Sequence, residues 1–137
     1  MLKIIKEKGL GSTLGQEEIK ILSEVIKSKN TLTRGPYLEK FEEIFAKLSG
    51  SKFAVAVNSA TSALHIACLA LGLKKGDKLW TSPNSFVASA NCALYCRAKV
   101  DFVDINPLTY NLCTVELEKK LIKAKKQSKL PKILIPV

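Results

Sequence analysis

The 137-residue sequence has no apolar run of about 18 residues, the length that a helix needs to cross a bilayer. Its first residues also lack the apolar core of a secretory signal peptide. We therefore expect a cytoplasmic protein with no membrane partner. With 47% apolar and 25% charged residues, the composition is typical of one globular domain, or part of one, and argues against a disordered chain.

Residues that commonly bind metals are scarce. The only histidine is His65, and the four cysteines (Cys68, Cys92, Cys96 and Cys113) form no C-x-x-C motif. A structural zinc site needs about four ligands, so we expect no metal site. The cysteines are interpreted as small buried hydrophobic residues in a reducing compartment.

Arginine is also scarce, although the chain is strongly basic. The net charge is 22 − 12 = +10, yet Arg34 and Arg97 are the only arginines. Proteins that recognise specific DNA sequences rely on arginine for bidentate contacts. Half of the excess charge lies in residues 116–137, where seven lysines accompany two acidic residues. A nucleic-acid-binding domain is therefore the weakest of our hypotheses, and we expect no nucleic-acid partner.

Helical and strand patterns alternate along the chain. Two helices are expected first, over residues 16–28 and from residue 36 to Gly50. Apolar strands and helices then alternate, with strands at residues 53–57, 78–81, 99–103 and 133–137 and helices at residues 64–71, 86–96 and 114–126. This order predicts an α/β fold with a mostly parallel sheet flanked by helices on both faces. Residues 132–137 resemble the middle of a larger domain, so we expect the domain to be truncated.

One short segment has the pattern of an anion site. Asn58–Leu64 is small and polar and lies between an apolar strand pattern and a helix pattern. The start of a helix offers free N–H groups and the positive end of the helix dipole, which together favour a phosphate group. A Ser/Thr helix cap without a ligand explains the same residues and is commoner. The glycines of a Walker loop or a G-x-G-x-x-G motif are missing.

A second segment, Trp80–Asn91, follows the next expected strand. Ligands of open α/β sheets bind at the carboxyl edge of the strands, where this segment begins. Phe86 has a ring that is suited to stacking on a flat ligand. Packing in the core at the start of a helix is the alternative role for this residue.

Four segments together resemble the DegT/DnrJ/EryC1/StrS family of sugar aminotransferases. They are Asn58–His65 (NSATSALH), Lys74–Asn91 (KKGDKLWTSPNSFVASAN), Ala98–Leu112 (AKVDFVDINPLTYNL) and Leu130–Val137 (LPKILIPV). The segments occur in the order found in the family, and the resemblance extends from about Gln16 to Val137.

The resemblance implies the large domain of a fold type I enzyme that depends on pyridoxal 5′-phosphate (PLP). Ala60 and Thr61 match the turn that binds the cofactor phosphate, and Phe86 matches the aromatic residue that stacks on the pyridine ring. The residues that match a nucleotide-sugar contact are Asn30, Thr31, Leu32 and Thr33, together with Ala60. On this basis residues 1–36 are an N-terminal arm and first helix, and residues 37–137 are an incomplete PLP-binding large domain.

The resemblance also implies that the catalytic lysine is absent from these residues. The family's Schiff-base lysine, and the aspartate that faces the pyridine nitrogen, lie beyond the segment that ends at Val137. No catalytic residue is therefore assigned, and we expect the 137-residue chain to be inactive alone. A truncated gene, a split gene and an incomplete record are all compatible with this expectation.

The function implied for the complete enzyme is amino transfer from glutamate to a UDP-linked 4-keto-6-deoxy amino sugar. Such enzymes serve nucleotide-sugar and surface polysaccharide biosynthesis, here in the pseudaminic acid pathway, and a homodimer is expected. A non-catalytic subunit that completes a split site with a second polypeptide is the alternative.

The resemblance finally implies an order of strands within the sheet. The 78–81 strand is expected in the middle of three parallel strands, between the 99–103 and 133–137 strands. The 53–57 segment is expected to lack its neighbouring strand.

Overall fold

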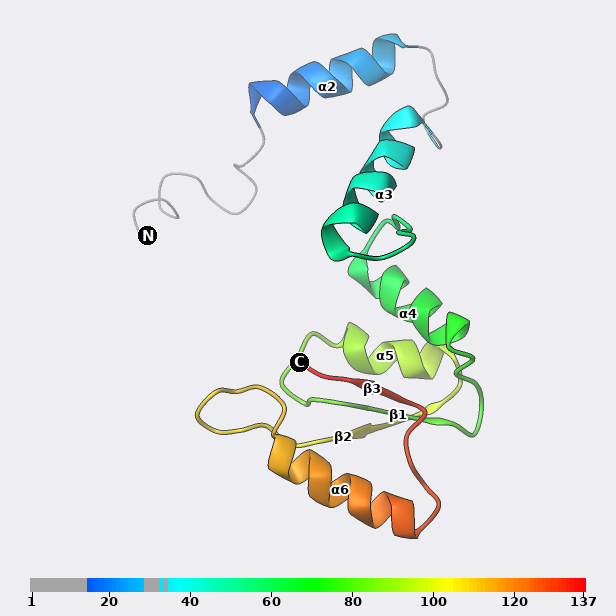
Figure 1. Ribbon diagram of the computed structural model, residues 1–137, viewed down its shortest axis with the longest axis vertical. Helices are drawn as coiled ribbons and strands as arrows, with labels where there is room; N and C mark the ends of the chain where they lie inside the picture. The colour runs from blue at the N-terminus through cyan, green and yellow to red at the C-terminus, as the bar shows by residue number, and fades with distance from the viewer. Residues whose placement is uncertain (1–14, 29–32, 34) are drawn as a thin grey trace. The chain divides into compact units, whose positions relative to one another are not determined.

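The computed structural model describes residues 15–28, 33 and 35–137 (Figure 1). These residues fall into two compact units, one that extends to Ala56 and one that comprises Val57–Val137. Within the described residues, no helix is long and apolar enough to cross a membrane.

The first unit contains two helices, α2 (Gln16–Lys27) and α3 (Pro36–Ser49). Both confirm the prediction from the apolar spacing. Helix α3 begins at Pro36, where the missing N–H of proline has no consequence, and ends at Gly50, whose φ of 67° is a left-handed conformation that glycine adopts without strain.

The expected strand at residues 53–57 is not formed. This segment has no strand pairing, and Phe53 and Val55 are 75% and 73% exposed, so the prediction of a buried strand is wrong. The Ala56 N–H instead donates to Glu42 Oε1 of α3 at 2.8 Å.

The second unit is a three-layered α/β structure. Its elements in chain order are α4 (Ala60–Ala70), β1 (Lys78–Thr81), α5 (Ala88–Tyr95), β2 (Lys99–Phe102), α6 (Thr114–Lys126) and β3 (Ile133–Ile135). The three strands are parallel in the order β2-β1-β3, which confirms the predicted sheet with the 78–81 strand in the middle. Figure 1 shows α5 on one side of the sheet and α6 on the other.

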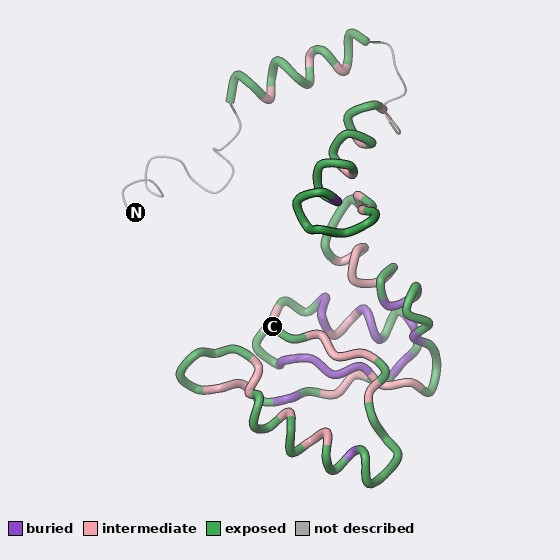
Figure 2. Tube along the Cα trace, viewed as in Figure 1, coloured by how far each residue is buried: buried purple, intermediate pink, exposed green. Residues whose placement is uncertain are grey.

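The described residues form two hydrophobic core clusters, one on each face of the sheet, and consecutive residues of β1 belong to each in turn. Leu79 belongs to a cluster with Cys68 of α4 and Cys92 of α5, whereas Trp80 points to the opposite face and packs with Val103 and Ala124. The alternation follows from the pleat of a strand, which places neighbouring side chains on opposite faces. Burial accordingly concentrates on β1 and α5, while α6 is mostly exposed (Figure 2).

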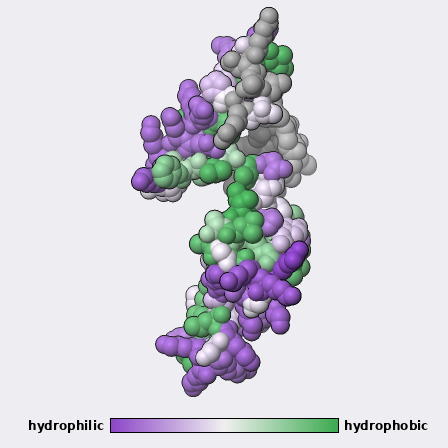
Figure 3. Space-filling model, turned by 90° about the vertical axis from the view of Figure 1, so that its right-hand side faces the viewer, coloured by the Kyte–Doolittle hydropathy of each residue, from purple (hydrophilic) through white to green (hydrophobic). Residues whose placement is uncertain are grey.

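Helix α6 contains five of the twenty lysines of the chain. It buries Ala124 and exposes four of these lysines, of which Lys123, Lys125 and Lys126 lie in its last turn. Figure 3 shows hydrophilic residues at the lower end of the molecule, where α6 lies. The exposed lysines of α6 therefore lie on a solvated helix face.

The cysteines of the core cluster that contains Leu79 confirm the interpretation as buried hydrophobic residues. Cys68, Cys92 and Cys96 are buried in one cluster, and Cys113 is half-buried. Burial, together with the neighbouring Cys92 thiol, raises the pKa of Cys68 to about 12, so this thiol stays protonated. A protonated thiol is neither a good nucleophile nor a metal ligand.

Thr81→Val tests an unusual feature of β1. Thr81 is fully buried, and its Oγ1 has no hydrogen-bond partner among the described residues. We expect the valine variant to keep or raise the free energy of unfolding, by about 1 kcal/mol, because it removes an unsatisfied buried hydroxyl. Thr81→Ala, which leaves a cavity, should lower it. Urea denaturation of both variants makes the comparison; a valine variant less stable than the alanine variant contradicts it.

Thiol labelling with an aromatic disulfide tests the burial of the cysteines. Near neutral pH, Cys113 should react first, because it is the only one of the four that is partly exposed. The other three should react only after denaturant is added. Cys113→Ser should abolish the fast phase; a fast phase that persists in this variant contradicts the assignment.

Candidate functional site

The start of α4 is built by three side chains. Ser59 is the N-cap residue, with extended backbone, and its Oγ accepts the Ser62 N–H at 3.2 Å. The Ser62 hydroxyl in turn donates to Asn58 Oδ1 at 2.7 Å. The hydroxyls of Ser59 and Ser62 therefore hold the turn itself.

Two backbone donors remain at this helix end. The N–H groups of Ala60 and Thr61 are the first two of α4, and no hydrogen bond to either is found among the described residues. Ala60 is exposed and Thr61 is half-buried. Since no acidic residue lies in the first turn, nothing there competes with an anion for the positive end of the helix dipole. The arrangement suits a small anion such as a phosphate group.

A second candidate group lies in the loop between β1 and α5. Phe86 is 75% exposed, so packing in the core is not its role. The predicted helix at residues 86–96 begins only at Ala88. Residues 82–87 form a loop, in which Ser82 Oγ accepts the Asn84 N–H at 3.3 Å and the Ser85 and Ser89 hydroxyls lie 3.0 Å apart.

The fold brings the start of α4 and Phe86 toward the same end of the sheet, the end at which the parallel strands finish. All three strands are parallel, and Phe86 follows the carboxyl end of β1. In Figure 1, α4 and α5 both begin on the side toward which β1 runs. That the turn and Phe86 act on one ligand stays a prediction.

The other predicted site residues lie elsewhere in the chain. Asn30, Thr31 and Leu32 lie outside the described residues. Thr33 is exposed and belongs to the first unit, whereas Ala60 belongs to the second. Their shared contact with a nucleotide-sugar stays a prediction.

Tyr110 lies near the same end of the sheet and was not predicted as a site residue. The Tyr110 carbonyl oxygen lies 3.5 Å from Asn84 Nδ2, which ties the loop after β2 to the loop after β1. Tyr110 has a φ of 60°, uncommon for a bulky residue, and its N–H donates to the Asn106 carbonyl at 2.8 Å. No motif in the sequence indicates the contact of Tyr110 with Asn84, because the two residues lie 26 positions apart.

Comparison with known proteins gives one family. A sequence profile of the DegT/DnrJ/EryC1/StrS aminotransferase family matches residues 12–137, nearly the whole chain.

Individual relatives agree with this match. The UDP-4-amino-4,6-dideoxy-N-acetyl-beta-L-altrosamine transaminase of Campylobacter jejuni is 42% identical over 80% of this chain and 28% of its own length. The spore coat polysaccharide biosynthesis protein SpsC of Bacillus subtilis is 42% identical over 77% of this chain and 27% of its own length.

The fold is also found among solved structures. The crystal structure of NtdA from Bacillus subtilis, with bound cofactor PMP, matches 90% of this chain and 28% of its own with a TM-score of 0.74 and 29% identity. The chain thus spans less than a third of the length of each of these relatives.

Ser59→Ala tests the cap of α4. The variant should lower the free energy of unfolding by about 1 kcal/mol, because the Ser62 N–H loses its acceptor. Ser51→Ala is the matched control, since Ser51 is exposed and lies outside the helices. Thermal unfolding followed by circular dichroism measures both. Equal stabilities of the two variants would show that the hydroxyl does not cap the helix.

Proposed function

We propose, because this chain belongs to the DegT/DnrJ/EryC1/StrS aminotransferase family, that it forms part of the PLP site of a nucleotide-sugar aminotransferase. The observation that carries the proposal is the pair of N–H groups at Ala60 and Thr61, which have no hydrogen-bond acceptor among the described residues. They lie in the segment that matches the family's phosphate-binding turn.

The residues present fit the phosphate of PLP. Ala60 and Thr61 would donate their N–H groups to its oxygens, and the dipole of the 11-residue α4 would add to the attraction. The Ser59 and Asn58 side chains act indirectly, because they hold the turn. Backbone N–H groups suit phosphate binding, because the helix fixes their direction before the ligand binds.

Phe86 would supply one face for the pyridine ring. Its exposure leaves the ring free to stack, which an aromatic residue in the core could not do. When bound, PLP supplies the electron sink that amino transfer requires. The described residues hold and orient it.

For the complete enzyme we propose glutamate as the amino donor and a UDP-linked 4-keto-6-deoxy amino sugar as the acceptor. The Campylobacter jejuni relative is named for a UDP-linked amino sugar of this kind, which supports the proposal. Asn30, Thr31, Leu32 and Thr33, with Ala60, would contact the nucleotide-sugar. We further propose a cytoplasmic homodimer serving surface polysaccharide biosynthesis, in the pseudaminic acid pathway.

We also propose that the lysine which anchors PLP, and the aspartate facing the pyridine nitrogen, are supplied by polypeptide other than these 137 residues. None of the lysines in this chain lies in a segment that matches the family's lysine motif. The 137-residue chain is then expected to bind the cofactor weakly and to transfer no amino group.

Binding of pyridoxamine phosphate tests the proposed site without interference from surface lysines, with which PLP itself reacts. Ala60→Pro removes one N–H donor at the first helical position, where proline is tolerated. A hydrogen bond to a charged group contributes about 1.5–3 kcal/mol, so affinity should fall roughly 10- to 100-fold. Isothermal titration against the wild-type chain measures the loss.

Two further variants make the result specific. Thr114→Pro places proline at the first position of α6 and should leave the affinity unchanged. Phe86→Leu should weaken binding of pyridoxamine phosphate but not of inorganic phosphate, whereas Ala60→Pro should weaken both. Unchanged phosphate binding by Ala60→Pro would exclude the start of α4 as the phosphate site.

A further inference from the structure

The loop that carries Phe86 is held mainly by bonds between close neighbours. Ser82 Oγ accepts the Asn84 N–H at 3.3 Å, and the Ser85 and Ser89 hydroxyls lie 3.0 Å apart. Both bonds join residues at most four positions apart, so neither connects the loop to a distant part of the fold. Among the described residues, one hydrogen bond ties residues 82–87 to a segment beyond α5. It runs from Asn84 Nδ2 to the Tyr110 carbonyl, at 3.5 Å.

The loop after β2, residues 104–113, is held by more hydrogen bonds of its own. At its base the Cys113 N–H donates to the Asp104 carbonyl at 2.8 Å, and further out the Asn106 N–H donates to the Asn111 carbonyl at 2.8 Å. The Asn106 side chain accepts two more backbone N–H groups of the turn, at 2.8 and 3.3 Å. This loop therefore has a defined backbone that does not depend on residues 82–87.

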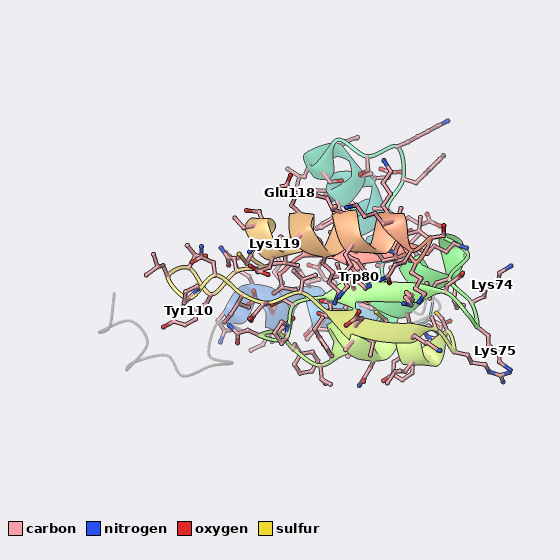
Figure 4. The ribbon with its side chains drawn as sticks, turned by 90° about the horizontal axis from the view of Figure 1, so that it is seen from below. Lys74, Lys75, Trp80, Tyr110, Glu118 and Lys119 are labelled. Carbon is pink, nitrogen blue, oxygen red and sulfur yellow. The ribbon has the colours of Figure 1, made fainter. Side chains whose placement is uncertain are left out.

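Tyr110 offers its backbone carbonyl, not its side chain, to Asn84. It lies on the part of the 104–113 loop that extends past the end of the sheet (Figure 4). Its N–H donates to the Asn106 carbonyl at 2.8 Å, and its φ of 60° is in the left-handed region. Glycine adopts this conformation without strain, whereas a β-branched residue does not. Substitutions at Tyr110 can therefore separate the role of its backbone from that of its ring.

We propose that the 104–113 loop positions Phe86 for the pyridine ring, through the hydrogen bond between Asn84 and the Tyr110 carbonyl. The proposal rests on the proposed function, in which Phe86 stacks on the ring. Asn84 lies two residues before Phe86, so a restraint there limits the conformations of the backbone that carries the ring. One hydrogen bond limits this range without fixing the ring. Asn84 is thus a positioning residue, which acts through Phe86 and not on the ligand.

Asn84→Ala removes the donor and tests the proposal. Affinity for pyridoxamine phosphate should fall about 2- to 10-fold, the loss that one neutral hydrogen bond explains. Affinity for inorganic phosphate should not change, because the start of α4 is untouched. Asn111→Ala is the matched control, since it removes the same side chain from the other loop, where that side chain forms no hydrogen bond among the described residues. Equal affinities of the two variants for pyridoxamine phosphate, in isothermal titration, overturn the proposal.

Two substitutions of Tyr110 assign the effect to its backbone. Tyr110→Gly and Tyr110→Val both remove the ring, but only valine is strained at a φ of 60°. The glycine variant should bind pyridoxamine phosphate like the wild-type chain, and the valine variant should lose as much as Asn84→Ala. The double variant of Asn84→Ala and Tyr110→Val should lose no more than either alone, because both break one contact. Additive losses, or a glycine variant as weak as the valine variant, contradict the proposal.

Backbone order parameters of the ligand-free chain give a readout that does not depend on the proposed function. Residues 85–87 should have values near those of ordered backbone, about 0.85, and Asn84→Ala should lower them toward those of flexible loops, below about 0.6. Asn111→Ala should leave them unchanged. Unchanged values in Asn84→Ala overturn the positioning role while the proposed function stands. A wild-type chain that binds pyridoxamine phosphate no more tightly than inorganic phosphate instead contradicts the ring contact of the proposed function, and with it the role of Asn84.

Discussion

The second unit depends on β1, because it alone among the described strands is paired on both sides. β1 has only four residues, and two of them, Leu79 and Trp80, belong to the two hydrophobic cores, one on each face of the sheet. With both edges paired and both faces covered, β1 leaves little room for polar groups. The indole N–H of Trp80 and the hydroxyl of Thr81 are nevertheless buried there without described partners, each at a cost of about 1–3 kcal/mol. The free energy gained by packing these side chains therefore outweighs the cost of their missing hydrogen bonds.

The parallel direction of the strands determines where the loops of the second unit lie. It gathers the loops after β1 and β2 at one edge, where Asn84 meets the Tyr110 carbonyl and Phe86 is exposed. On the outer side of β2, Lys120 of α6 pairs with Asp101 at 2.9 Å and donates to the Phe102 carbonyl, so α6 and β2 are joined by charged groups as well as by packing.

Local signals predicted the elements well, and distant contacts explain what they missed. Helix α6 has the predicted bounds, because its apolar spacing acts within the helix itself. The order of the strands came from the family resemblance, since nothing in a strand's own residues selects its neighbours. Residues 53–57 have the composition of a strand but pair with no strand among the described residues, so Phe53, Val55 and Val57 are exposed. The contacts of Lys120 were not predictable, because they join residues 18 or more apart that share no motif.

The two parts of the proposed site differ in whether nearby or distant residues determine their position. The two N–H donors at Ala60 and Thr61 depend only on the first turn of α4, which Asn58, Ser59 and Ser62 fix within five residues. Phe86 instead depends on β1, because the end of that strand determines where its loop begins. Under the proposed function, a cofactor phosphate meets preorganised donors, whereas the ring meets a side chain on a loop. Phosphate contacts should therefore contribute most of the affinity, and the loop should adjust to the ring.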